Sequence, residues 1–320
     1  MLPLLGVANL TRGSMIRYIA GRLVSLIFVL LAVSLFPFIM LLEGRGGAFD
    51  LGARPVPAPT KAALEKKFGL DQPLWRQYIT YLWNVLHLDF GVPNKYPNET
   101  VISLIARTWP TTLKVGIVTI GIAYPLGLFL GYLAATRQRS PVDYSMTFLA
   151  TLGIAIPNFV LAIWLILLFG VHWQIFPLRG LDSWKSYVLP VTAYALGPMA
   201  LVARYTRSSL VDNLRADYVR TARAKGLSER RVMSRHVFRN ASIPLVTVIL
   251  PEIPNILTGS IFIEMAFGIP GIGRFFVQST FNRDYPMIMA LVLLVAAVWG
   301  LMYLITDILY VLLDPRIRLG

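Results

Sequence analysis

Three acidic side chains stand out because they fall inside long apolar stretches of the sequence: Glu252, Glu264 and Asp307. An ionisable group at membrane depth is costly, and it commonly marks a substrate path, an ion pair or a proton relay. Glu264 and Asp307 lie near the ends of their stretches. Glu252 lies nearer the middle, beside the helix breakers Pro251 and Pro254. Glu252 is therefore the candidate for a translocation path, and the alternative is a contact between two helices.

The other chemistry-bearing residues form no catalytic pattern. His87, His172 and His236 lie in three separate segments, so we expect no metal site, and His236 is interpreted as a structural donor between short helices. The absence of cysteine excludes disulfides and thiol catalysis. The sequence has no Gly-x-x-x-x-Gly-Lys-Ser/Thr phosphate loop, so we expect no ATP binding by that route. No Ser-His-Asp grouping or carboxylate pair favours hydrolysis. We therefore predict that the chain is not an enzyme.

Composition indicates a membrane protein. Of the 320 residues, 56% are hydrophobic and only 14% are charged, whereas soluble domains carry roughly 25% charged residues. A single water-soluble domain and intrinsic disorder are therefore excluded. The net charge of +14 would suggest nucleic acid binding in a soluble protein. Membrane topology explains this charge better, so we expect no nucleic acid partner.

Six stretches are long and apolar enough to cross the hydrocarbon core, which takes about 20 helical residues. They cover residues 23–42, 112–135, 144–171, 187–202, 243–267 and 287–313. Pro157 interrupts the third stretch, and the fourth is the weakest because it is short and contains Pro190 and Gly197. The first is too long for a signal-peptide core and no small-residue cleavage site follows it, so we expect a permanent anchor. The sequence therefore predicts an all-α polytopic membrane protein with six transmembrane helices.

Lysine and arginine are unevenly distributed among the connecting segments. With the N-terminus inside, the cytoplasmic segments contain Arg12, Arg17, Arg22, Arg137, Arg139, the many cations of residues 204–239, Arg316 and Arg318. The two short outer loops contain only Arg179, Lys185, Arg274 and Arg283. Because cytoplasmic loops carry an excess of Lys and Arg, we expect both termini in the cytoplasm.

The predicted outer segment, residues 43–107, contains one amphipathic helix after a Gly-, Pro- and Ala-rich linker at 43–60. Its apolar face is formed by Leu74, Tyr78, Tyr81, Leu82, Val85 and Leu86. The opposite face carries Arg76, Gln77, Thr80 and Asn84. Pro73 suits the first turn and Gly91 follows the helix end. We expect a small extracytoplasmic cap packed on the bundle, and a dedicated substrate site is the alternative.

The predicted cytoplasmic loop, residues 204–241, contains two short basic helices. Asp217 is placed to cap the first helix, in which Val219, Ala222 and Gly226 share one face. Small residues on that face would let another surface approach the backbone closely. Gly226 is expected to end the helix in the left-handed region.

Ser228 is placed to cap the second helix, which we expect to end near Arg239 before Pro244 forces a new start. Topogenic charge and attraction to anionic headgroups explain the cations of this loop. They do not explain two capped helices with a small-residue face. The loop is therefore predicted to be a docking surface for a cytoplasmic partner.

This loop resembles the "EAA" loop in permease subunits of binding-protein-dependent ABC importers, as it occurs in the dipeptide, oligopeptide and nickel branch. The similar run is Asp217-Tyr218-Val219-Arg220-Thr221-Ala222-Arg223-Ala224-Lys225-Gly226-Leu227, with Arg220 in place of the acidic residue of the general motif. Further similar motifs are residues 69–74, Asp89-Phe90-Gly91, Arg204-x-x-Arg207, His236-x-x-Arg239-Asn240-Ala241-x-x-Pro244, Glu264-x-x-Phe267-x-x-Pro270-Gly271-x-Gly273 and Asp307-x-x-Tyr310-x-x-x-Asp314-Pro315-Arg316.

The resemblance implies a B-type permease of a type I importer. Its parts would be an N-terminal segment and first helix (1–42), an extracytoplasmic segment (43–107), a five-helix core with a coupling loop (108–314 and 204–241) and a cytoplasmic tail (315–320). The implied ATPase-coupling residues are Asp217, Tyr218, Arg220, Thr221, Ala222, Ala224, Lys225, Gly226 and Leu227. The implied supporting residues are His236, Arg239, Asn240 and Pro244.

The resemblance also implies partners: a second, C-type permease subunit, two ATP-binding subunits that hold ATP and Mg, and an extracytoplasmic substrate-binding protein. The chain itself would bind no cofactor and would lie in the cell (inner) membrane as a multi-pass protein. The implied substrate is a di- or oligopeptide, and nickel or another small solute stays open. From a different class, an ion-coupled secondary carrier is the rival, although no internal repeat with paired broken helices is visible.

Overall fold

The computed structural model describes residues 12–43, 72–93 and 95–313, and its regular structure in these residues is helical. The long helices are α1 (Arg12–Glu43), α4 (Val101–Thr136), α7 (Trp184–Leu214) and α14 (Tyr285–Leu313). The outer and middle short helices are α3 (Leu74–Leu86), α5 (Pro141–Ala155), α6 (Asn158–Leu165) and the π-helix η1 (Ile166–His172). The others are α8 (Asp217–Ala224), α9 (Glu229–Arg231), the π-helix η2 (Val232–Val237), α10 (Phe238–Ile249), α11 (Glu252–Leu257), α12 (Ile261–Ala266) and α13 (Gly273–Phe281). Residues 44–60 of the predicted linker, 69–71 and 314–316 of the similar motifs, and the tail 315–320 lie outside the described residues.

Four helices in the described part of the chain are long and apolar enough to cross a membrane. They cover Arg17–Ile39, Val101–Thr136, Trp184–Leu214 and Tyr285–Leu309. Two bent pairs qualify as well if each is one span: Pro141–Ala155 with Asn158–His172, and Glu229–Ile249 with Glu252–Ala266. The all-helical architecture is thus confirmed, with four to six candidate spans.

The predicted third span is not one continuous helix. Its two halves meet at 100° where Ile156 adopts an extended conformation before Pro157. The proline ring disfavours the helical conformation of the preceding residue, which accounts for the break. The predicted fourth span is longer than expected, because α7 continues for 31 residues with Pro190 and Pro198 inside it.

Helices α4 and α7 approach each other closely at small residues. A Cβ added to Gly127 would lie 2.7 Å from the carbonyl oxygen of Met199, and one added to Gly131 would lie 2.5 Å from that of Ala203. Glycines four residues apart on one helix let two backbones pack together in a membrane. The pair α4–α7 is therefore the tightly packed centre of the fold.

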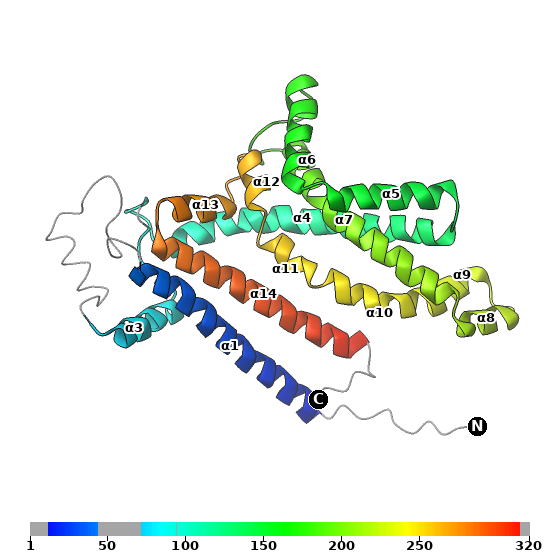
Figure 1. Ribbon diagram of the computed structural model, residues 1–320, viewed down its shortest axis with the longest axis horizontal. Coiled ribbons are helices and arrows are strands. Elements are labelled where there is room, and N and C mark those ends of the chain that lie inside the picture. Colours follow the sequence, from blue (N-terminus) through cyan, green and yellow to red (C-terminus); the bar gives the residue numbers. More distant parts are fainter. Residues whose placement is uncertain (1–11, 44–71, 94, 314–320) are drawn as a thin grey trace.

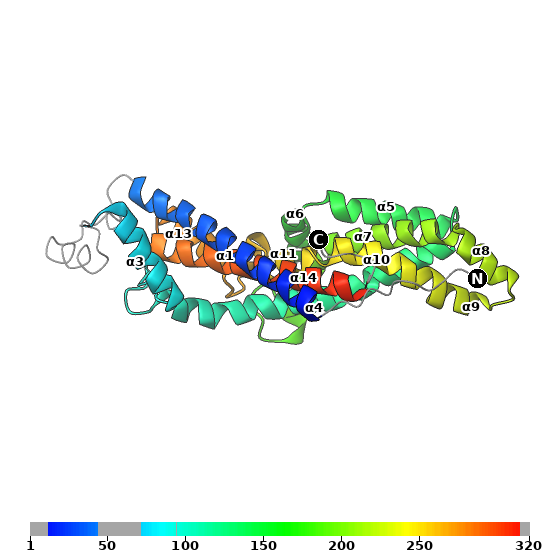
Figure 2. The ribbon, with the colours of Figure 1, turned by 90° about the horizontal axis from the view of Figure 1, so that it is seen from below.

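Helix α1 lies along α14 at one side of this centre (Figure 1). Arg22 and Asp307 join the two helices, with 2.9 Å between Nε and Oδ2. Figures 1 and 2 both place α3 and α13 at one end of the long axis and α8 and α9 at the other. The outer segment and the basic loop are thus far apart.

The predicted outer helix is present as α3, with Pro73 at its N-cap, and it packs on α1. The hydroxyl oxygens of Tyr78 and Ser34 are 2.8 Å apart. The expected polar and apolar faces are only partly correct, because Gln77 is buried whereas Leu74 and Leu86 are exposed. The contact face is rotated toward Gln77, whose Nε2 donates a hydrogen bond to a backbone carbonyl. That hydrogen bond gives the buried side-chain amide a partner for its N–H donor.

Candidate functional site

Helix α8 forms the first part of the basic loop, at the positions that the sequence predicted. Its N-cap is Ala216 rather than Asp217, and Ser228 occupies the N-cap of α9; neither cap has a side-chain hydrogen bond. The predicted capping by Asp217 is therefore wrong, whereas Ser228 occupies its predicted N-cap position without a capping hydrogen bond. Asp217 instead lies in the first turn of α8, where its negative charge interacts favourably with the helix dipole and stabilises the helix.

The second loop helix does not end near Arg239. It continues through η2 and α10 as far as Ile249, and Pro244 lies inside α10. Val237, Ala241 and Leu245 are all buried along one face of this helix. Pro244 has no backbone N–H, so the helix loses one hydrogen bond at that position. Burial of the apolar face offsets this loss, and the helix continues past the proline.

The small-residue face of α8 points into the protein. Val219 is 0% exposed and Ala222 is 5% exposed. They belong to an apolar cluster with Ala135, Leu210, Val232, Met233, Val237 and Ala241. The expectation that this face is open to a partner is therefore wrong for Val219 and Ala222, because the chain covers them with α7, η2 and α10, whereas Gly226 is exposed.

The opposite face of α8 and the following turn are exposed. It carries Asp217, Tyr218, Arg220, Thr221, Ala224, Lys225 and Gly226, while Leu227 packs partly on the cluster. Gly226 has a φ of +75°, which confirms the left-handed turn, and an added Cβ would meet nothing within 4 Å. The surface available to a partner is thus polar and basic, with small residues at its end.

An ion pair closes the turn between α8 and α9. Arg223 donates from Nη2 to Glu229 Oε1 at 2.6 Å and from Nε to Oε2 at 3.1 Å. The hydrogen bond to Glu229 raises the pKa of Arg223 above its ordinary value. Both side chains are exposed, so the pair contributes at most about 1 kcal/mol. Its effect is to fix the shape of the turn around Gly226.

Among the expected supporting residues, His236 and Arg239 contribute backbone carbonyl acceptors and Asn240 contributes a side-chain donor. Asn240 Nδ2 donates to the carbonyl of His236 at 3.0 Å, and the carbonyl of Arg239 accepts from Ser242. The ring of His236 makes no hydrogen bond within the described residues. A contact to the neighbouring α7 comes instead from Ser209 Oγ, which donates to the carbonyl of Ala241 at 2.8 Å.

A buried ion pair that the sequence did not reveal lies just before the loop. Arg207 on α7 donates from Nε and Nη2 to the two carboxylate oxygens of Asp143 on α5, with 2.8 Å between Nη2 and Oδ2. The Asp143 side chain is 3% exposed and also accepts from the amide of Arg139. The forked geometry of arginine holds the two helices in one relative orientation.

The three membrane-depth acids have different environments. Glu264 is buried and accepts hydrogen bonds from Thr112 Oγ1 at 2.7 Å and from the amide of Gly273 at 2.6 Å. Asp307 pairs with Arg22. Glu252 has no hydrogen bond or ion pair within the described residues. Of these three acids, Glu252 is therefore the one whose charge the described residues leave uncompensated.

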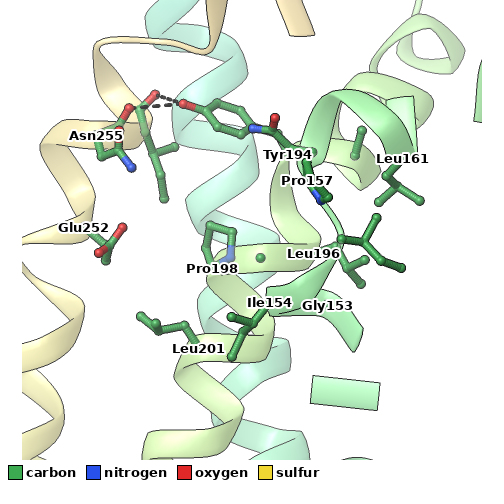
Figure 3. Close-up of a pocket in the computed structure, with 15 residues that line it drawn as sticks. Gly153, Ile154, Pro157, Leu161, Tyr194, Leu196, Pro198, Leu201, Glu252 and Asn255 are labelled. Atoms are coloured by element: carbon green, nitrogen blue, oxygen red, sulfur yellow. Dashed lines mark hydrogen bonds between the residues drawn. The ribbon is translucent and has the colours of Figure 1, made fainter. Parts of the chain in front are cut away.

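Glu252 lines a cavity of about 300 Å³ between α11, α7 and the break from α5 to α6. Figure 3 shows its carboxylate on one side of the cavity, with Pro198 and Leu201 of α7 facing it and Ile154 beyond them. The lining also contains two side-chain amides, Asn255 of α11 and Asn158 of α6. The cavity combines a broken helix with an unpaired carboxylate, as substrate sites of transport proteins do. No group of three or more His, Cys, Asp or Glu able to hold a metal occurs in the residues that the structure describes.

Apolar helices long enough to span a bilayer, a basic loop of short helices and a cavity at a helix break together define a membrane transport component. Residues 127–319 match the family described as binding-protein-dependent transport system inner membrane component, and residues 15–116 match its N-terminal membrane component. The chain belongs to this family.

Relatives and solved structures agree with that assignment. The chain is 41% identical over 305 residues to the dipeptide transport system permease protein DppB of Bacillus subtilis (strain 168), covering 95% of this chain and 99% of the relative. It is 37% identical over 308 residues to the oligopeptide transport system permease protein OppB of Escherichia coli (strain K12), covering 95% and 100%. A chain of the MetNI methionine ABC transporter in an inward facing conformation is 18% identical with a TM-score of 0.54, covering 67% of this chain and 97% of that one, and shows the shared fold.

Proposed function

We propose that this chain is the permease subunit of an ATP-driven, binding-protein-dependent importer of di- or oligopeptides. The relatives named for dipeptide and oligopeptide transport match it over 95% of its length, which favours peptides over nickel or another small solute. The observation that carries the proposal is the exposed face of α8, at the opposite end of the molecule from α3 (Figure 2). An importer needs such a loop on the side where ATP is hydrolysed.

In this proposal the chain crosses the cell membrane six times, each bent pair being one span, and both ends lie in the cytoplasm. The excess of cations in the loop at 204–241 and the separation of that loop from α3 support this orientation. The outer segment and α13 then face the side from which a substrate-binding protein delivers the peptide. A second permease subunit completes the path.

Two ATP-binding subunits, which hold ATP and Mg, would dock on the exposed face of α8. This differs from docking through Val219 and Ala222, because those residues are buried by the chain itself. Ala222 in the predicted coupling set thus has the role of attaching α8 to the bundle. Arg220, Ala224 and Lys225 remain as candidates for direct contact.

Movement at α8 would reach the cavity through α7. The cluster that covers Val219 includes Leu210 of α7, and the same helix carries Tyr194 and Leu201 on the cavity wall. A continuous helix is a stiff connection, so a displaced α8 shifts the cavity lining as well. Glu252, on the other wall, would face the translocation path.

The experiment is ATP-dependent peptide uptake by the assembled transporter, with a bulky side chain added at Ala224. Ala224→Trp should leave the chain folded because the position is exposed, yet it should reduce copurification of the ATP-binding subunits and lower uptake more than tenfold. Thr136→Trp, an exposed change at the end of α4 outside the loop, is the matched control and should behave like the unmodified chain.

Two substitutions at Gly226 distinguish backbone strain in the turn from loss of contact with the ATP-binding subunits. Asparagine adopts a positive φ readily, so Gly226→Asn adds little strain to the turn. Valine does not, so Gly226→Val adds about 1 kcal/mol or more of strain and should lower uptake per assembled complex. Normal uptake and docking in both Ala224→Trp and Gly226→Val would remove the coupling role. Robust ATP hydrolysis by the isolated chain would contradict the subunit assignment.

A further inference from the structure

We propose, on the basis of the importer function above, that the Glu252 cavity binds the protonated amino group of the peptide as it crosses the membrane. Glu252 would thereby make this permease select for substrates that carry an ammonium group. The site is the space of about 300 Å³ that Glu252 shares with Asn255, Tyr194 and the helix break at Ile156 and Pro157.

The first argument is the uncompensated charge. A carboxylate at membrane depth is normally paired, as Asp307 is with Arg22, or satisfied by donors, as Glu264 is by Thr112 and Gly273. Glu252 is half-buried and has neither arrangement in the described chain. No lysine, arginine or histidine lines its cavity. The positive charge that would compensate Glu252 is therefore supplied from outside the residues that the structure describes.

The second argument is that the nearby tyrosine hydroxyls already donate to backbone carbonyls, so the remaining side-chain donors on the cavity wall are the neutral amides of Asn158 and Asn255. Tyr194 donates its hydroxyl to the carbonyls of Asn255 at 3.1 Å and Ile256 at 3.3 Å. Tyr124 donates to the carbonyl of Ile249 at 3.1 Å. Both tyrosines thus satisfy carbonyl groups on the bent span around Glu252, and their hydroxyl protons are not free to solvate its carboxylate.

Together these features leave a cavity with a negative charge and no cationic side chain on its wall. The complementary ligand carries a positive charge and several N–H donors, and an ammonium group supplies three donors. A peptide carboxylate would be repelled from the same place. The cavity volume lies at the lower end of the ~300–1,000 Å³ range of ligand pockets, which suits a terminal residue rather than a whole peptide.

A simpler role for Glu252 is to favour the start of α11 through the helix dipole. That effect is small, up to about 1 kcal/mol, and α11 has only 6 residues. It would not require a cavity in front of the carboxylate. Replacement by glutamine tests both roles, because the amide keeps the side-chain shape and removes the charge.

The experiment measures peptide protection of a thiol inside the cavity. The chain has no cysteine, so Leu201→Cys on the facing wall gives it a single thiol. The permease and ATP-binding subunits are assembled in lipid nanodiscs without the substrate-binding protein, so that its own selectivity plays no part. Alkylation of the thiol by a maleimide is followed against the concentration of Ala-Ala, N-acetyl-Ala-Ala or N-acetyl-lysine amide, with the complex lacking Leu201→Cys as the background.

Ala-Ala should slow alkylation, and Glu252→Gln should raise the concentration needed for half-protection about tenfold. Glu252→Asp, which keeps the charge, should stay close to the unmodified chain and shows that the variant complexes are folded. N-acetyl-Ala-Ala should protect weakly and equally in all variants. Protection by N-acetyl-lysine amide would assign the site to ammonium groups in general, and its absence would restrict the site to the terminal amine.

Three results would overturn the proposal: no protection by Ala-Ala, equal protection by its acetylated form, or equal protection in Glu252→Gln. The importer function is tested separately by uptake in the complete system. A complex that transports Ala-Ala but shows no dependence of protection on Glu252 refutes the ammonium site alone. A complex that transports no peptide refutes the proposed function.

Discussion

Replacing Glu264 should loosen three helices at once. Its carboxylate joins α4, through Thr112 Oγ1, to the first amide of α13, at Gly273, while Glu264 itself lies in α12. Thr112 Oγ1 also accepts from the amide of Ile272 at 3.0 Å. The carboxylate fits closely, since a Cβ on Gly271 would overlap it. Glu264 is therefore the point at which the turn between α12 and α13 is attached to the bundle.

The magnitude follows from the two hydrogen bonds. In Glu264→Gln one carboxylate oxygen becomes an N–H donor facing another donor, and hydrogen bonds to charged groups contribute about 1.5–3 kcal/mol each. The neutral amide also avoids the cost of burying a charge, which offsets part of the loss. We expect the free energy of unfolding to fall by about 1–3 kcal/mol. For Glu264→Ala we expect about 3–5 kcal/mol, because both donors lose their acceptor and a cavity remains.

The assay is equilibrium unfolding of the purified chain in mixed micelles with increasing sodium dodecyl sulfate. Glu264→Gln, Thr112→Val and the double variant form a cycle whose coupling energy should be about 1 kcal/mol or more. Thr119→Val is the matched control: Thr119 is buried on the same helix, and its hydroxyl has no hydrogen-bond partner in the described residues. Unchanged stability of Glu264→Gln, or strictly additive effects in the double variant, would refute the reasoning.

Three further predictions concern packing, pairing and topology. Arg207→Ala should lower the free energy of unfolding by about 1–3 kcal/mol because it removes the cationic partner of the buried Asp143 carboxylate, which keeps the amide of Arg139 as a donor, and adding Asp143→Asn should restore part of it in the same assay. Gly131→Ala should destabilise by about 1–3 kcal/mol by separating α4 from α7, whereas Gly121→Ala, with nothing within 4 Å of the new Cβ, should be neutral or stabilising. In intact cells an impermeant thiol reagent should label Thr80→Cys and leave Lys225→Cys unlabelled, and the reverse pattern would overturn the proposed orientation.

The sequence predicted the helices well where a long apolar run or a clear period defined them. The outer helix α3 and the long spans follow from such local patterns. The 100° break beside Pro157 could not be predicted, because a proline locates a break without setting its angle. The angle depends on tertiary contacts such as the one between Phe159 and Phe262, whose ring centroids are 5.4 Å apart.

The local backbone of the candidate site was predicted better than its contacts. The positive φ of Gly226 followed from a local rule about helix ends. The orientation of Val219 and Ala222 did not, because periodicity shows which residues share a face and not what covers that face. The pairs Asp143–Arg207 and Thr112–Glu264 are 64 and 152 residues apart in the sequence, so no local pattern connects them.

The arrangement of rigid and broken helices suggests how the two ends of the chain communicate. Helix α7 is one element of 31 residues, about 46 Å long, and it reaches from the cavity wall to the loop. The close packing of Gly127 and Gly131 against it attaches α4 to α7. The opposite cavity walls belong to the two bent spans, whose breaks interrupt the backbone ladder and leave them easier to deform. We therefore expect a displacement that begins at α8 to be carried along α7 and taken up at the two breaks, where Glu252 and the extended Ile156 line the cavity.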